Sequence, residues 1–169
     1  MKAKALLIGI LILIAAYVAG AIYTLSNSKI ESVIISGAGE DGLYIPNAIS
    51  HAYLMNFRLR DSDIKELESR AGIATLFGVQ DEDRKYLYLD SFIKNGASVN
   101  AESVISGLPP LHAALLFNDS KLVHFLILRG AETKQKNTQF GMNAHDFVKH
   151  LQAKKPLIDR SDVLIALSL

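Results

Sequence analysis

Five histidines are the side chains of this sequence best suited to bind a metal or to move a proton. His145 and His150 are five residues apart, so one helix would not present both on the same face, and no H-E-x-x-H motif occurs. His51 and His124 fall in segments with helical apolar spacing and are expected to be partly exposed. Since no G-x-S-x-G motif or P-loop occurs either, we expect no catalytic, cofactor or metal site and no enzymatic activity.

The sequence also offers no cysteine site and no convincing carboxylate site. The chain has no cysteine, which excludes disulfides, thiolate zinc sites, a cysteine nucleophile and a lipid-anchored cysteine. Residues 81–83 (DED) form a short acidic run, but a calcium site needs more oxygen ligands at set spacing. The run is therefore interpreted as a solvated turn or the start of a helix.

Residues 37–42 (GAGEDG) match G-x-G-x-x-G and follow residues 33–35, which read as a short strand. In a dinucleotide-binding unit the third glycine opens a helix whose amides hold pyrophosphate. Glu40 and Asp41 would oppose that anion, and no parallel β-α-β pattern follows. The segment is predicted to be a flexible linker over residues 26–45.

Length and charge limit the possible functions. The 169 residues allow one small domain with appendages. The 18 basic and 17 acidic residues nearly cancel, whereas a nucleic-acid-binding protein needs a basic face to neutralise phosphates. No nucleic-acid partner is expected.

The N-terminus predicts export. Lys2 and Lys4 precede an uncharged apolar run over residues 5–25, which as a helix would span roughly 30 Å, about one bilayer core. Basic residues stay in the cytoplasm, so the rest of the chain should cross the membrane. Residues 19–21 (AGA) also resemble a signal-peptide cleavage site, so the run is either an inner-membrane anchor or a cleaved signal. Either reading places the body of a bacterial chain in the periplasm.

The rest of the chain reads as helical. Apolar spacing predicts helices over residues 46–59, 64–70 and 159–169. Pro46 suits a helix first turn, residues 61–63 (DSD) offer N-caps, and Gly72 is expected to end the second helix. Asp159 or Ser161 would cap the last helix, which closes the domain.

A 34-residue period runs through the second half. Gly96-Ala97 recurs as Gly130-Ala131, and Gly107 recurs as Gly141. Such a period is typical of solenoids, whose units bury their apolar faces by stacking.

The residues at this period resemble the ankyrin-repeat family. Residues 107–114 (GLPPLHAA) resemble its G-x-T-P-L-H-x-A opening, and residues 122–131 (LVHFLILRGA) resemble its outer helix and closing Gly-Ala. Residues 89–101 resemble the end of a preceding repeat and residues 141–148 the start of a following one. The resemblance covers about residues 72–152 and implies an all-α solenoid of about three repeats.

The sequence departs from the family pattern in three places. Pro109 replaces the usual Thr, His145 stands where Leu is common, and the hairpins of residues 96–107 and 130–141 are one residue longer than the norm. The resemblance also implies that His112 makes a structural hydrogen bond to neighbouring backbone.

The resemblance further implies where a partner would dock, on the inner helices and on the hairpin tips near residues 98–106 and 132–140. The positions that carry over are Leu108, Leu116, Phe117, Met142, His150 and Leu151. An exposed pair at positions 116 and 117 would be an apolar interface patch. The alternative is that these side chains pack against the N-terminal helices.

The sequence thus predicts three parts: an anchor or signal peptide over residues 1–25, a linker over 26–45 and a helical ankyrin-repeat domain over 46–169. Without a catalytic constellation, the expected role is binding another protein in the periplasm. By analogy, small exported binding proteins resemble immunity proteins that inhibit secreted antibacterial toxins such as lipases. The alternative is a scaffold or accessory protein that holds an enzyme complex at the inner membrane.

Overall fold

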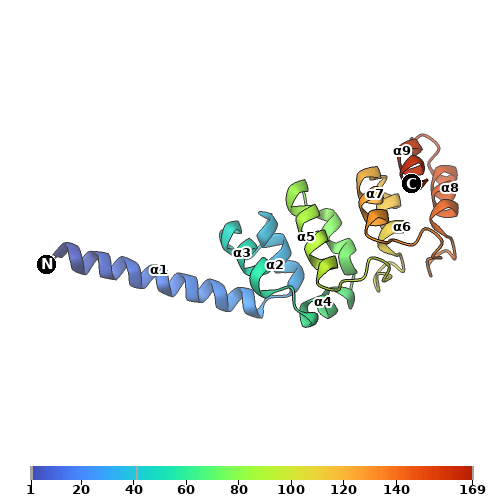
Figure 1. Cartoon of the computed structure of the whole chain (residues 1–169). Coiled ribbons are helices and arrows are strands. Elements are labelled where there is room, and N and C mark those ends of the chain that lie inside the picture. Colours follow the sequence, from blue (N-terminus) through green and yellow to red (C-terminus); the bar gives the residue numbers. More distant parts are fainter. Residues whose placement is uncertain (1, 41, 169) are drawn as a thin grey trace. The chain divides into compact units, whose positions relative to one another are not determined.

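The protein is all-helical in the part of the chain that the computed structural model describes, residues 2–40 and 42–168 (Figure 1). The elements are α1 (Lys2–Asn27), α2 (Ile30–Ala38), α3 (Asn47–Phe57), α4 (Asp61–Glu68), the 3-10 helix η1 (Gly72–Gly78), α5 (Glu82–Lys94), α6 (Pro110–Phe117), α7 (Ser120–Leu128), α8 (Ala144–Lys154) and α9 (Ser161–Ala166). They divide into two compact units, Met1–Arg58 and Leu59–Leu169. The predicted all-α class is confirmed.

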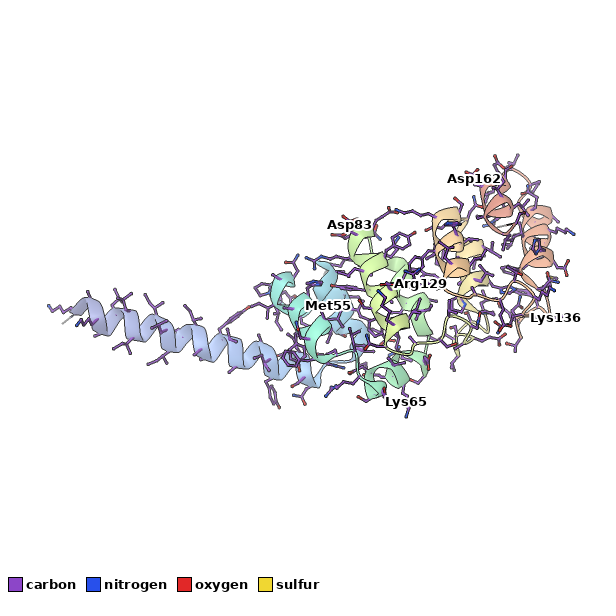
Figure 2. The ribbon with its side chains drawn as sticks, viewed as in Figure 1. Met55, Lys65, Asp83, Arg129, Lys136 and Asp162 are labelled. Atoms are coloured by element: carbon purple, nitrogen blue, oxygen red, sulfur yellow. The ribbon has the colours of Figure 1, made fainter. Side chains whose placement is uncertain are left out.

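Helix α1 is long and apolar enough to cross a membrane. Its side chains project outward along the helix (Figure 2), and only Ala21 and Leu25 among its described residues are buried. The apolar N-terminal helix expected over residues 5–25 is therefore present.

The first unit corrects two expectations. Residues 33–35 are not a strand, and much of the expected linker over residues 26–45 is helix α2, which packs on α3. The reason is that Ile30, Val33 and Ile34 are spaced for one helical face, and all three are buried. A buried 2.7 Å hydrogen bond between Ser36 Oγ and Ser50 Oγ joins the two helices.

The glycine motif does not form a nucleotide-binding loop. Gly37 is buried inside α2, and Gly39 ends that helix with a left-handed backbone (φ 88°). Asp41 lies outside the described residues. In its described residues the motif begins as the last turn of α2 and its C-cap.

Arg58 joins the end of α3 to the end of α1. The side chain is buried, and its Nη1 donates to the carbonyl oxygens of Leu25 at 2.7 Å and Ser28 at 3.0 Å. Leu25 lies in the last turn of α1 and Ser28 directly follows the helix, where a cation also complements the helix dipole. Arg58 therefore ties the apolar helix to its compact unit.

Arg58→Ala is expected to lower the free energy of unfolding of this unit by about 2–4 kcal/mol, because one buried and one partly buried carbonyl lose a charged donor. Hydrogen exchange of full-length protein in detergent micelles would measure this as faster exchange in α2 and α3. Arg58→Lys serves as the partial rescue. Unchanged exchange in the Ala variant would contradict the assignment.

The first helix of the second unit starts and ends at other residues than expected. Helix α4 starts at Asp61, so residues 61–63 lie inside the helix, where the Asp63 carboxylate accepts from the Arg60 backbone N–H at 3.2 Å. Gly72 does not end this helix; with φ 60° it opens η1 after Glu68 has ended α4.

Contacts in the second unit follow a regular order. The element η1 packs on α4, α5 and α6, helix α6 packs on α7 and α8, and α7 packs on α9. The predicted C-terminal helix is present as α9, preceded by Asp159, whose Oδ1 accepts from the backbone and hydroxyl of Ser161. Leu169 lies outside the described residues.

The 34-residue period is also a period of backbone geometry. Ser103 N–H donates to Leu108 O at 3.0 Å, and 34 residues later Asn137 N–H donates to Met142 O at 3.0 Å. The left-handed glycines match as well: Gly96 (φ 104°) with Gly130 (φ 91°), and Gly107 (φ 63°) with Gly141 (φ 65°). The two loops are copies of one hairpin.

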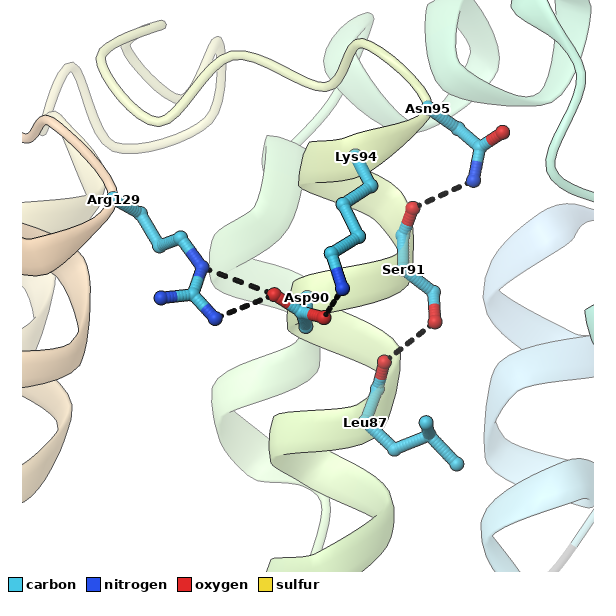
Figure 3. A network of polar contacts seen from close by, with 6 residues as sticks. All are labelled: Leu87, Asp90, Ser91, Lys94, Asn95 and Arg129. Atoms are coloured by element: carbon cyan, nitrogen blue, oxygen red, sulfur yellow. Dashed lines mark hydrogen bonds and ion pairs between the residues drawn. The ribbon is translucent and has the colours of Figure 1, made fainter.

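An ion-pair network joins α5 to the end of α7 (Figure 3). Asp90 Oδ1 accepts from Arg129 Nη2 at 2.6 Å and Nε at 3.0 Å, and Asp90 Oδ2 lies 2.6 Å from Lys94 Nζ. These hydrogen bonds, from Lys94 first and Arg129 second, lower the pKa of Asp90 below its usual value.

A double-mutant cycle with Asp90→Ala and Arg129→Ala should give a coupling energy of about 0.5–1 kcal/mol, as for a partly exposed ion pair. Because the pKa of Asp90 is lowered by folding, the coupling is complete above the usual carboxylate pKa of about 4 and is lost as the pH falls below it. Urea unfolding at several pH values measures both. A coupling that persists at pH 2 would contradict the ion-pair assignment.

Candidate functional site

The second unit contains a half-open groove with a volume of about 530 Å³. Its walls come from the C-terminal end of α6, the tip of the second hairpin, one face of α8 and the loop that precedes α9. The volume falls in the range of sites that accept a small ligand or the side chains of a docked chain.

Helix α6 supplies exposed apolar side chains. Pro110 stands in its first turn, and the helix stops at Asn118, which has a left-handed backbone (φ 59°). In the last turn Leu116 is 49% and Phe117 66% exposed, whereas Leu108, before the helix, is a buried residue of the groove lining. Phe117 also meets Phe77 edge-on, with ring centroids 6.5 Å apart.

Helix α8 supplies the opposite wall. Asn143 caps it by accepting the Asp146 N–H at 3.0 Å. Phe147, His150, Leu151 and Lys154 follow at helical spacing, so one face of α8 carries all four into the groove lining.

The hairpin tip closes one end of this wall. The Phe140 ring lies 5.6 Å from the rings of both Phe147 and His150. Phe140 is 40% exposed, so it both supports the α8 face and extends the apolar surface.

Five of the six residues predicted to bind a partner line this groove: Leu108, Leu116, Phe117, His150 and Leu151. The sixth, Met142, is not part of the lining; its carbonyl oxygen instead accepts hydrogen bonds from His112 and Asn137. A binding role for any of them stays a prediction.

Sequence reasoning missed several members of the groove. Lys154 could have been found, because it lies one helical turn beyond His150 on the same face. Phe140 and Ile158 lie in loops, so no periodic pattern marks them; only tertiary contacts place them here.

Cations surround one part of the groove. Lys154 and Lys155 are exposed, and neither has an ion-pair partner among the described residues. Arg160 is buried and caps α6 by donating from Nη1 to Leu115 O at 2.9 Å. Of the described residues that line the groove, none is Asp or Glu, so its charge is entirely positive.

Two polar atoms in the lining lack partners. Arg160 Nε and His150 Nε2 are buried and have no hydrogen-bond partner in the described structure.

Among the described residues, no group of three His, Asp or Glu side chains is placed to hold a metal ion. His112 is fully buried, its Nε2 lies 3.0 Å from Met142 O, and its ring lies 5.3 Å from the Phe147 ring. The expected structural hydrogen bond to neighbouring backbone is therefore confirmed. Burial lowers the pKa of His112 below its usual value.

His112→Ala should lower the free energy of unfolding by about 1–3 kcal/mol through the lost hydrogen bond and a new cavity. Because folding lowers the pKa of His112, its neutral form favours the folded state. Wild-type stability should therefore fall as the pH drops below about 6.5, and His112→Ala should flatten this slope. Urea unfolding at pH 8, 6.5 and 5 measures both effects; an equal slope in the two proteins would contradict the assignment.

Comparison of the chain with protein-family models, curated proteins and solved structures found no match. The function must therefore be argued from the geometry of the chain itself.

Proposed function

We propose that this protein is a membrane-anchored protein-binding module of the ankyrin-repeat type. Three features support the architecture. The elements η1 and α5 pack as one pair and α6 and α7 as the next, while α8 packs on α6 and α9 packs on α7, as successive layers of an ankyrin stack do. The two hairpins also repeat at 34 residues, and His112 bonds to the Met142 carbonyl next to the second hairpin. In such a solenoid the inner helices and hairpin tips form the binding face.

The N-terminal helix serves as the anchor. Residues 19–21, which resemble a cleavage site, lie within the continuous helix α1, and Ala21 is buried in its unit. Both features favour an uncleaved helix. Lys2 and Lys4 hold the N-terminus in the cytoplasm, which directs the chain that follows α1 to the periplasm.

The single observation that carries the binding function is the exposed Leu116–Phe117 pair at the edge of an apolar groove. Patches of large apolar side chains that are exposed to solvent mark interaction sites. Aromatic side chains that enter a partner's surface supply much of the binding free energy. The groove offers space for side chains from the partner.

The partner that fits this location best is a secreted toxin, such as a lipase, that reaches the periplasm and is inhibited there. The second candidate, a scaffold for an enzyme complex at the inner membrane, uses the same anchor and groove. Deleting the gene separates them: loss of an immunity protein makes cells sensitive to the toxin, whereas loss of a scaffold lowers an existing activity.

The binding function is tested by recovery of partners on tagged full-length protein from membranes. Leu116→Ser/Phe117→Ser should abolish co-purification of a partner that wild type recovers. Leu164→Ser/Ile165→Ser is the matched control, because these exposed apolar residues lie on α9, outside the groove. Equal recovery by both variants would overturn the assignment of the groove.

A further inference from the structure

We propose that the partner segment that fills the groove is acidic and amphipathic: it inserts a large apolar side chain and places a carboxylate against Lys154 and Lys155. This inference rests on the proposed protein-binding function and adds the chemistry of the occupant. It follows from the apolar walls, the charge of the lining and the apolar surface beyond the groove.

The walls select an apolar group. Leu116 and Phe117 on one side and Phe140 and Leu151 on the other leave a space of about 530 Å³ between them. A leucine, phenylalanine or tryptophan side chain that enters this space removes apolar surface on both sides from water. Such a central anchor is the usual source of binding energy in a small interface.

The charge selects an anion. Lys154 and Lys155 are exposed and unpaired among the described residues, and the buried guanidinium of Arg160 lies in the same lining. The guanidinium of Arg160 donates to a carbonyl at the end of α6, whereas the side chains of Lys154 and Lys155 make no hydrogen bond or ion pair in the described structure. A carboxylate on the occupant would lie in a positive field with no competing acid in the described lining.

The surroundings favour a protein segment over a free fatty acid. Leu157 is 98% exposed in the loop next to the lining residue Ile158, and Phe117 remains 66% exposed at the edge. A single acyl chain inside the groove would leave this outer apolar surface in water, whereas a helix laid across the groove would cover it. On such a helix, an apolar side chain and an acidic side chain three or four residues apart would share one face. The first would enter the apolar groove and the second would reach Lys154 and Lys155.

The probe is a displayed library of twelve-residue helical peptides with randomised positions, selected against full-length protein in lipid nanodiscs. Enriched peptides should carry Asp or Glu three or four residues from Leu, Phe or Trp. Their affinity should fall at least about tenfold for Lys154→Glu/Lys155→Glu. Replacing the acid in the peptide by Lys should restore binding to that variant.

The matched control is Lys65→Glu/Lys149→Glu, which changes the charge equally. Lys65 lies on α4, and Lys149 lines a different face of α8. This variant should bind the selected peptides as wild type does.

The outcomes separate the two proposals. Enriched peptides that need Phe117 but lack an acid, or that bind the Lys154→Glu/Lys155→Glu variant equally well, would overturn the acidic occupant and leave protein binding standing. If no peptide depends on Phe117, both proposals fail. Dodecanoate binding that depends on Lys154 and Lys155, without peptide enrichment, would assign the groove to a fatty acid and overturn the inference.

Discussion

Phe147→Ala is expected to lower the free energy of unfolding of the Leu59–Leu169 unit by about 3–5 kcal/mol. The Phe147 side chain is 1% exposed and lies against the rings of His112 and Phe140. Removing it leaves a cavity where α6, α8 and the second hairpin meet, and a domain of this size has only about 5–15 kcal/mol of stability in total. The Phe147→Ala variant should therefore lose both the α8 side of the groove and much of the stability of this unit.

Urea unfolding of full-length protein in detergent micelles, with Phe117→Ala as the control, measures this effect. Phe117 is mostly exposed, so the same substitution there should cost less than about 1 kcal/mol. Phe117→Ala should nevertheless weaken partner binding, which separates folding from recognition. Similar losses of stability in the two variants would contradict the described burial.

Leu13→Asp/Ala16→Asp is expected to remove the protein from the membrane. Both residues lie near the middle of the apolar run in α1, where each charge costs about 2.5–3.5 kcal/mol of insertion free energy. Together the two charges cost about 5–7 kcal/mol, enough to prevent stable insertion. Asn27→Asp, at the end of α1, is the control and should leave insertion unchanged.

Alkaline carbonate extraction followed by mass measurement checks this prediction. Wild type should stay in the membrane pellet with its N-terminal helix intact, and the double variant should leave the pellet. Recovery of wild-type protein in soluble form, with the mass of a chain that begins at Ile22, would contradict the anchor and assign α1 to a cleaved signal.

Two features of the second unit were anticipated. The glycines recur at 34 residues, and the backbone at each of the four positions is left-handed. The resemblance to ankyrin repeats implied the two hairpins and the hydrogen bond of His112 to neighbouring backbone, and that hydrogen bond is present. The ankyrin-repeat assignment of the whole stack stays a prediction.

The first unit shows where sequence reasoning failed. The glycines at 37, 39 and 42 drew attention to a loop, although Ile30, Val33 and Ile34 already had helical spacing. Helix α2 forms because those side chains are buried against α3, and a tertiary contact decides what a short apolar run becomes. Arg160 was missed for a related reason, because it reaches Leu115 of α6 from a loop that lies 45 residues further along the sequence.

The most direct measurement of the central claim is site-specific photo-crosslinking in living cells. A photoreactive phenylalanine analogue would be placed in turn at Phe117 and Leu151 in the groove, and at His124 and Lys149 outside it. We expect the two groove positions to give the same discrete adduct with a second protein and the two outer positions to give none. Adducts of equal yield at all four positions, or at none of them, would contradict a protein-binding groove.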